Sequence, residues 1–182
     1  MRALMLIPLL VACGGVQRPD GGSGLLPVGS HVPELWAEDQ TGETVELVAP
    51  LDQWVVLYFY PKDGTPGCTK EACAFRDAWD AYDQANVEVI GVSSDSAESH
   101  REFAQEHGLP FSLVADTDNR WARAFGVPSL VGMYDRVTFL LDPDGKVAHV
   151  YTDIEPGLHA KEVLRDLEAL GFEAAVDNNA PS

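Results

Sequence analysis

The sequence has few positive charges, few cysteines and no long apolar stretch. It holds 12 Lys and Arg against 29 Asp and Glu, which gives a formal net charge of −17. Phosphate binding needs clustered Lys and Arg, so this balance argues against a nucleic-acid partner. No segment approaches the ~20 apolar residues of a membrane-spanning helix, and no internal repeat is visible. A chain of 182 residues with 46% hydrophobic residues suits one domain with a full core.

The N-terminus carries a short apolar run that ends in a cysteine. Arg2 is followed by the apolar residues 3–12 and then by Cys13, which is the architecture of a compressed secretion signal. The segment Leu10–Cys13 resembles the lipobox of bacterial lipoproteins, in which the cysteine is acylated. The expectation is a signal peptide over residues 1–12 and a membrane contact made only through a lipid anchor at Cys13. The expected location is the bacterial cell envelope, at the outer membrane or in the periplasm. A misassigned start with a chance cysteine is the alternative.

Composition sets the expected limits of the domain. After Cys13, the stretch up to residue 30 is rich in Gly, Pro and Ser, which predicts a flexible tether. The folded domain is expected over residues 31–172, and residues 173–182 are expected to form a flexible tail.

Hydrophobic periodicity predicts strands that alternate with helices. Strands are expected over residues 55–60, 87–92, 111–115, 137–141 and 146–151. Helices are expected over residues 68–84, from the capping pair Asp95 and Glu98 to Gly108, over residues 119–125 and over residues 158–170. This order predicts a three-layer α/β/α sandwich with a mixed central sheet, and a thioredoxin-like arrangement fits it.

Two further cysteines lie near the start of the first predicted helix. Cys68 follows a Pro- and Gly-rich turn, and Cys73 stands five residues later. Unpaired N–H groups and the helix dipole favour an anion at a helix N-terminus. Such a site lowers the pKa of a thiol and favours the nucleophilic thiolate.

The spacing of these cysteines makes a mechanical prediction. Five residues along an intact α-helix separate two Cα atoms by about 8–9 Å, and disulfides rarely tolerate more than ~7 Å. Cys68 and Cys73 can therefore bond only if the first helical turns unwind. Such a bond would protect an oxidised Cys68 from further oxidation.

Two plainer interpretations remain for the cysteines. Both could be buried and inert, since free cysteine is among the most buried residue types. A zinc site is the other, but no second Cys or His pair completes one. No metal or other cofactor is expected. The five histidines are expected to be surface or internally satisfied residues rather than ligands.

The segment Tyr58–Cys73, YFYPKDGTPGCTKEAC, resembles the active-site segment of the peroxiredoxins. The Pro-x-x-x-Thr-x-x-Cys core is specific to that superfamily, and a second cysteine five positions on marks the Q type, also called the bacterioferritin comigratory protein subgroup. Similar stretches include Gly91–Ser93 and Arg136–Phe139. The resemblance covers about residues 25–172 and implies a thioredoxin-like fold.

The resemblance also implies a role for each matched residue. Cys68 matches the peroxidatic cysteine, which becomes a sulfenic acid, and Cys73 matches the resolving cysteine, which forms the disulfide with it. Thr65 matches the hydroxyl that hydrogen-bonds thiolate and peroxide. Pro61 matches the proline that shields the pocket, and Arg136 matches the guanidinium that stabilises the thiolate and polarises the O–O bond.

The substrate is expected to touch Thr65, Arg136 and the backbone N–H groups of Gly67 and Cys68, because donors there would stabilise the leaving oxygen. Without the resemblance, Arg136 reads as a surface ion pair and Thr65 as a turn residue. Glu71 could orient Arg136 or simply complement the helix dipole.

The expected activity is antioxidant reduction of hydrogen peroxide and organic hydroperoxides, with thioredoxin or a thioredoxin-like protein as reductant and a monomer as the working form. Three alternatives stay open. They are a membrane-anchored thiol–disulfide oxidoreductase, a copper-delivery protein of thioredoxin fold, and a redox-inactive binding module.

Overall fold

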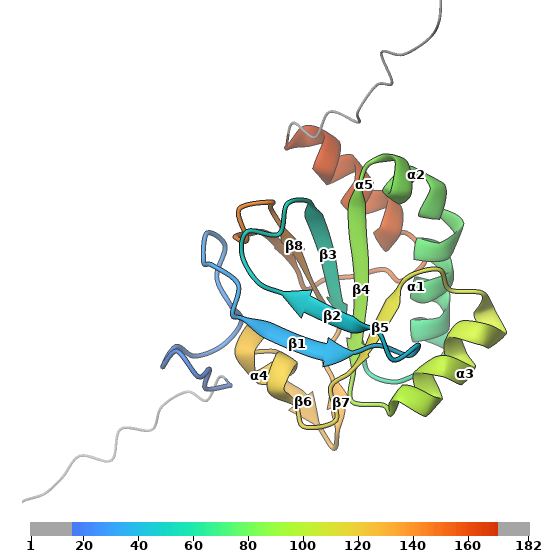
Figure 1. Cartoon of the computed structure of the whole chain (residues 1–182), viewed down its shortest axis with the longest axis horizontal. Coiled ribbons are helices and arrows are strands. Elements are labelled where there is room, and N and C mark those ends of the chain that lie inside the picture. The colour runs from blue at the N-terminus through green and yellow to red at the C-terminus, as the bar shows by residue number, and fades with distance from the viewer. Residues whose placement is uncertain (1–15, 171–182) are drawn as a thin grey trace, which may run out of the picture.

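A five-stranded mixed sheet lies at the centre of the computed structural model (Figure 1). Its strand order is β5-β4-β3-β8-β9. Strand β3 (Trp54–Phe59) pairs in parallel with β4 (Val87–Ser93), which pairs in parallel with β5 (Ser112–Ala115). On the other side of β3, β8 (Val137–Leu141) and β9 (Val147–Tyr151) run antiparallel. The predicted α/β sandwich with a mixed sheet is confirmed.

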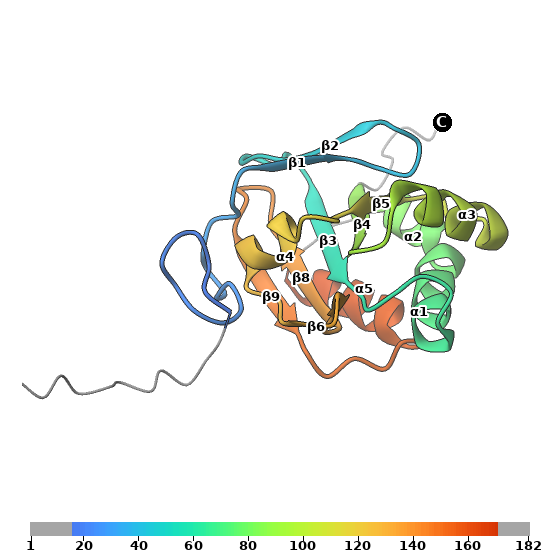
Figure 2. The same ribbon diagram turned by 90° about the horizontal axis from the view of Figure 1, so that it is seen from below.

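Both faces of the sheet are covered, which explains the unbroken apolar run of β3. One face packs against α1 (Pro66–Asp77), α2 (Trp79–Gln84), α3 (Ala97–His107) and α5 (His159–Ala169). The opposite face packs against α4 (Arg120–Phe125) and a two-stranded hairpin of β1 (Leu35–Glu38) and β2 (Thr44–Leu47). Figure 2 shows this hairpin lying across one side of the sheet, away from α1 and α5.

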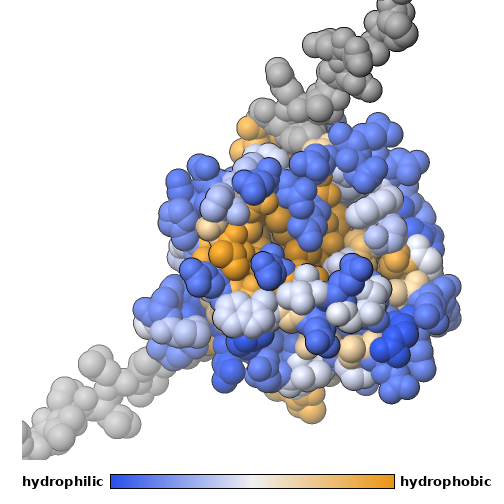
Figure 3. Space-filling view, viewed as in Figure 1, coloured by the Kyte–Doolittle hydropathy of each residue, from blue (hydrophilic) through white to orange (hydrophobic). Residues whose placement is uncertain are grey.

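Alternate residues of β3 enter the two cores. Val56 and Tyr58 belong to the core under α1 and α5, whereas Val55 and Leu57 belong to the core under the hairpin. Figure 3 shows polar residues around the margin of the molecule and apolar residues gathered at the middle of the visible face.

The first predicted helix is divided in two. Residues 68–84 were expected to be continuous, but the helix stops at Ala78, whose N–H bonds to the carbonyls of both Ala74 and Phe75. The apolar stripe that suggested one helix crosses the break because α1 and α2 face the same core. The predicted capping pair was also wrong, since Ser96 caps α3 by accepting the Ser99 N–H. Gly108 ends α3 in a left-handed conformation, as expected.

The packed part of the chain starts earlier than residue 31. The structure describes residues 16–170, so the predicted signal, Cys13 and the predicted tail lie outside the described residues. Within the predicted tether, Leu26 is buried and its N–H bonds to the Phe125 carbonyl at 2.9 Å. The segment around Leu26 is not a free linker, because the Leu26 side chain is buried in the core that contains Phe125 of α4.

Two hairpins were not predicted, namely β1–β2 and the short pair β6 (Ser129–Leu130) and β7 (Met133–Tyr134). Their strands have two to four residues, which is too few for a clear alternation of apolar and polar residues. Over residues 16–170, no helix has the length and apolar character needed to cross a membrane.

Candidate active site

The pairing of the strands brings an arginine and a cysteine to one edge of the sheet. Strand β3 runs antiparallel to β8 with Phe59 opposite Val137, so Arg136 precedes β8 at the edge where β3 ends. The chain then passes through a Pro- and Gly-rich loop and enters α1 at Pro66. Proline suits the first turn of a helix because its missing N–H would have no partner there. Cys68 therefore stands in the first turn of α1, above that edge.

Arg136 reaches the sulfur of Cys68 directly. Its Nη2 atom lies 3.4 Å from Cys68 Sγ, and Cys68 is 1% exposed. Gly67 permits this approach, since a Cβ atom at that position would stand 3.3 Å from Nη2. The guanidinium therefore places a positive charge directly beside a buried sulfur, where water screens charges little.

Glu71 holds the other end of the guanidinium. Its carboxylate is fully buried and pairs with Arg136 Nη1. Burial raises the pKa of Glu71 to about 7, while the charge of Arg136 and the hydrogen bond from it act in the opposite direction. Of the two roles considered for Glu71, the structure supports orientation of Arg136. Its second oxygen, Oε1, has no hydrogen-bond partner among the described residues.

Thr65 and Pro61 lie in the loop before Cys68, but they make no hydrogen bond to its sulfur. Thr65 precedes α1, and its hydroxyl donates to the Lys62 carbonyl at 3.0 Å. Pro61 is half-buried and lies two residues after the end of β3. Of the five predicted catalytic residues, the structure brings Cys68 and Arg136 into contact. Thr65 and Pro61 lie in the loop before Cys68, and Cys73 lies further along α1.

Cys73 has different surroundings. It is half-buried and, like Cys68, a free thiol. Cys73 lines a cavity of about 600 Å³ between α1, α2 and α5, together with Lys70, Ala74, Asp77, Ala78, Ala81, Gly157, Lys161 and Leu164. Because both cysteines lie in one unbroken helix, Pro66–Asp77, a bond between them requires α1 to unwind.

Sequence reasoning missed a buried polar cluster behind the active-site loop. Asp63, within that loop, pairs with His100 of α3 at 2.8 Å, and both side chains are almost fully buried. His100 was expected to be an ordinary satisfied histidine. An Asp within a Pro- and Gly-rich turn is common in exposed turns, so Asp63 by itself did not indicate a buried pair. Among residues 16–170, no group of three His, Cys, Asp or Glu side chains is arranged to hold a metal ion.

Comparison with known proteins identifies similar chains. The model of the AhpC/TSA family matches residues 28–150. Peroxiredoxin Q, chloroplastic, of Triticum aestivum is 45% identical over 163 residues, which cover 88% of this chain and 70% of that protein. The protein of the same name from Sedum lineare is 45% identical over 145 residues, which cover 78% of each chain.

Solved structures agree with these sequence matches. The crystal structure of peroxidoxin BcpB from Mycobacterium tuberculosis has a TM-score of 0.74 and 34% identity, and the match covers 80% of this chain and 98% of that one. A structure of Xanthomonas campestris peroxiredoxin Q has a TM-score of 0.70 and 38% identity, with 74% and 90% of the two chains covered.

These relatives correct the predicted location. Curated relatives from Triticum aestivum, Sedum lineare and Arabidopsis thaliana are named chloroplastic proteins, which contradicts a place in the bacterial cell envelope. That prediction rested on ten apolar residues before Cys13. So short a segment defines an export signal poorly, because signal peptides usually have ~15–30 residues.

Proposed function

Since the chain belongs to the AhpC/TSA family, in its peroxiredoxin Q subgroup, and is a thiol-dependent peroxidase, we propose that Cys68 attacks the peroxide and that Cys73 resolves the product. The family implies a hydroperoxide substrate and a thioredoxin-type reductant. The observation that carries the assignment of Cys68 is the contact of Arg136 Nη2 with its buried sulfur at 3.4 Å.

The first step transfers one oxygen atom to Cys68. The thiolate attacks the terminal oxygen of the peroxide, an S–O bond forms, the O–O bond breaks, and the leaving oxygen takes a proton to become water or an alcohol. Negative charge develops on that leaving oxygen, and donors already in place lower the barrier. We assign this stabilisation to Arg136 and to the backbone N–H groups of Gly67 and Cys68. Thr65 would contribute after its hydroxyl turns from the Lys62 carbonyl, and Pro61 would limit the access of water.

The second step forms the disulfide. The thiolate of Cys73 attacks the sulfur of the Cys68 sulfenic acid, an S–S bond forms, the S–O bond breaks, and the oxygen takes a proton and leaves as water. The helical separation of the two residues requires the turns between Cys68 and Cys73 to open first. A dithiol reductant then attacks the disulfide, returns both cysteines to thiols and is itself oxidised to a disulfide. We propose thioredoxin or a thioredoxin-like protein for this role.

The choice of peroxide follows from a relative. One structure of the bacterioferritin comigratory protein of Xanthomonas campestris concerns its alkyl peroxide reduction activity. We therefore propose that this chain accepts organic hydroperoxides in addition to hydrogen peroxide. The thiol–disulfide oxidoreductase and copper-delivery alternatives find no support in the comparisons.

Two predictions made from the sequence accompany this function. We propose that the protein acts as a monomer, which light scattering of the reduced and oxidised forms would test. Acylation of Cys13, the only membrane contact proposed, would be tested by mass spectrometry of the mature N-terminus.

Rapid-mixing kinetics test the assignment of Cys68. Trp79 begins α2, next to the break at Ala78, so its fluorescence should respond when α1 opens. The reduced wild type should react with hydrogen peroxide far faster than a free thiol, and Cys68→Ser should show no such reaction. A Cys68→Ser variant that reacts at the wild-type rate would overturn the assignment.

A further inference from the structure

Asp63 connects the active-site loop to the body of the domain, and its side chain is almost fully buried. Asp63 stands between Pro61 and Thr65, and its Oδ1 atom accepts the Tyr60 hydroxyl at 2.8 Å. Its Oδ2 atom accepts the Ser99 hydroxyl at 2.7 Å and lies 2.8 Å from His100 Nδ1. The N–H of Asp63 donates to Asp95 Oδ2 at 2.9 Å. The loop is thus tied to the end of β3, to the segment after β4 and to α3.

His100 is itself fixed on both sides of its ring. Its Nε2 atom lies 3.2 Å from the carbonyl oxygen of Val114 in β5, and the side chain is fully buried. Both ring nitrogens therefore face oxygen atoms that accept hydrogen bonds. The hydrogen bond from His100 lowers the pKa of Asp63 although burial acts in the opposite direction, which keeps the carboxylate ionised as an acceptor.

We propose that Asp63 and His100 are positioning residues for the peroxide reaction, which hold the loop so that the first turn of α1 presents Cys68 to Arg136. This inference rests on the proposed function of Cys68. Neither residue touches the sulfur. The loop has few other means of keeping its shape, since Gly64 has a φ of +67° and the Thr65 hydroxyl bonds only within the loop.

The position of the loop should affect the rate of the peroxide reaction, because a small displacement of Cys68 would break the contact between its sulfur and Arg136. A displacement of about 1 Å in a reacting group can cost ~10²-fold in rate. A cluster that served stability alone would change the unfolding temperature without changing the rate of the folded enzyme. A positioning role therefore predicts a lower rate constant at temperatures well below the unfolding transition, whereas a purely stabilising role predicts an unchanged one.

Two substitutions of His100 separate its two hydrogen bonds. In His100→Asn the side-chain nitrogen occupies the place of Nδ1 and can still donate to Asp63. In His100→Gln the nitrogen occupies the place of Nε2, so it keeps the bond to Val114 and loses the one to Asp63. The measurement is the second-order rate constant of the reduced full-length chain with hydrogen peroxide, beside the unfolding temperature of each variant. We expect the rate constant of His100→Gln to be lower than that of wild type by about tenfold or more. The rate constant of His100→Asn should stay within about threefold of wild type.

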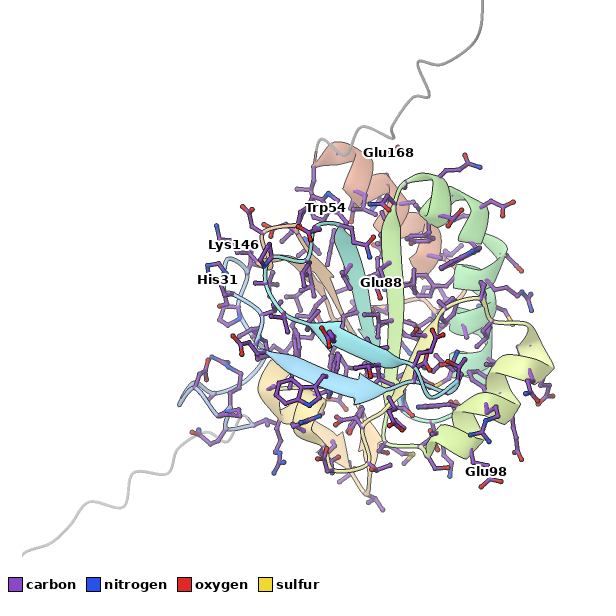
Figure 4. All side chains as sticks on the ribbon, viewed as in Figure 1. His31, Trp54, Glu88, Glu98, Lys146 and Glu168 are labelled. Atoms are coloured by element: carbon purple, nitrogen blue, oxygen red, sulfur yellow. The ribbon has the colours of Figure 1, made fainter. Side chains whose placement is uncertain are left out.

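A milder pair on the surface of α3 tests the same claim if the histidine variants do not fold. Ser99→Ala removes one donor to Asp63, whereas Ser96→Ala removes the N-cap of the same helix and touches neither Asp63 nor His100. Glu98, between them, points outward at the lower end of α3 (Figure 4). Ser96 is exposed and Ser99 is half-buried. Ser99→Ala should slow the reaction severalfold, and Ser96→Ala should lower the unfolding temperature with an unchanged rate constant.

The outcomes separate this inference from the proposed function. A wild-type chain that reacts no faster than a free thiol would remove the function and the inference together. A fast wild type with an equally fast His100→Gln, or with equal losses in His100→Gln and His100→Asn, would overturn the positioning role alone. If only the serine pair folds, equal rate constants for Ser99→Ala and Ser96→Ala would overturn it.

Discussion

The two cysteines of α1 lie five residues apart in one helix, yet their surroundings differ sharply. Cys68 is buried and touches a guanidinium that Glu71 orients. Cys73 is half-buried and borders a cavity of about 600 Å³ lined mainly by small side chains and by methylene stems. One end of the helix is fixed by charge, and the other end has space beside it.

This difference matches the two tasks proposed for the helix. A nucleophile works best when its partners are already in place, because no reorganisation is then needed in the transition state. A resolving thiol must instead travel, and a segment with adjacent empty space loses less packing when it moves. The predictions below test each end of α1 in turn.

The largest effect is expected at Cys73. Cys73→Ser should leave the first reaction with peroxide within about twofold of wild type, because Cys73 has no contact with Arg136. Catalytic turnover with a thioredoxin-type donor should be lost, since no intramolecular disulfide forms. Stopped-flow and steady-state assays of the same preparation give both numbers. A variant that slows the first reaction as much as the turnover would place Cys73 in the chemistry of Cys68.

The reaction of Cys68 with peroxide should be slowed when the guanidinium of Arg136 is removed. Arg136→Ala should slow the first reaction by about 10²–10³-fold, the range seen when one donor to a developing oxyanion is removed. Disulfide formation from an already oxidised Cys68 should change much less. Single-turnover kinetics separate the two steps. A first reaction as fast as that of the wild type would show that the contact at 3.4 Å has no part in catalysis.

Glu71 should make the stability of the fixed end depend on pH. Its pKa is about 7 in the folded protein, against 4.5 for an unperturbed Glu, so the folded state binds more protons than the unfolded chain between these two pH values. The stability that protonated Glu71 contributes to the folded state is fully present below pH 4.5 and is lost as the pH rises through 7. Glu71→Gln cannot ionise, so it should gain about 1–3 kcal/mol relative to wild type between pH 5 and pH 8. Denaturant unfolding at both pH values measures this, and a constant difference would contradict it.

The smallest effect is expected away from both cysteines, in the hairpin of β6 and β7. Val131 is 89% exposed with a φ of +53°, a conformation that a β-branched residue rarely adopts. Gly132 follows with a positive φ, so the pair forms the kind of turn in which Asn-Gly is preferred. Val131→Asn should stabilise the protein by about 1 kcal/mol without changing the peroxide rate. A raised unfolding temperature with a lowered rate would link this hairpin to the site.

Long apolar patterns made most of the fold predictable. The buried runs in β3, β4 and β8 defined the sheet, and the prediction for residues 137–141 matches β8 residue for residue. The break at Ala78 was not predicted, because α1 and α2 present their apolar residues to one core. The hairpins β1–β2 and β6–β7 escaped because their strands are too short for a periodic signal.

The site was predictable where the chemistry is local in sequence. A cysteine after a Pro- and Gly-rich turn indicates a helix N-terminus, and the family motif added Arg136, 68 residues away. The role of Glu71 depended on tertiary contacts, since a first-turn Glu is favourable for the dipole as well. The Asp63–His100 pair spans 37 residues, and neither residue has a pattern that points to the other.

The most direct test follows the wild-type chain through one turnover. One equivalent of hydrogen peroxide is added to the reduced protein, and one sample is used for peptide mass mapping and for amide hydrogen exchange. We expect a disulfide between Cys68 and Cys73, together with faster exchange across residues 66–77 and unchanged exchange in β4. Two free thiols after the reaction, or a bonded pair with α1 as protected as before, would contradict the account.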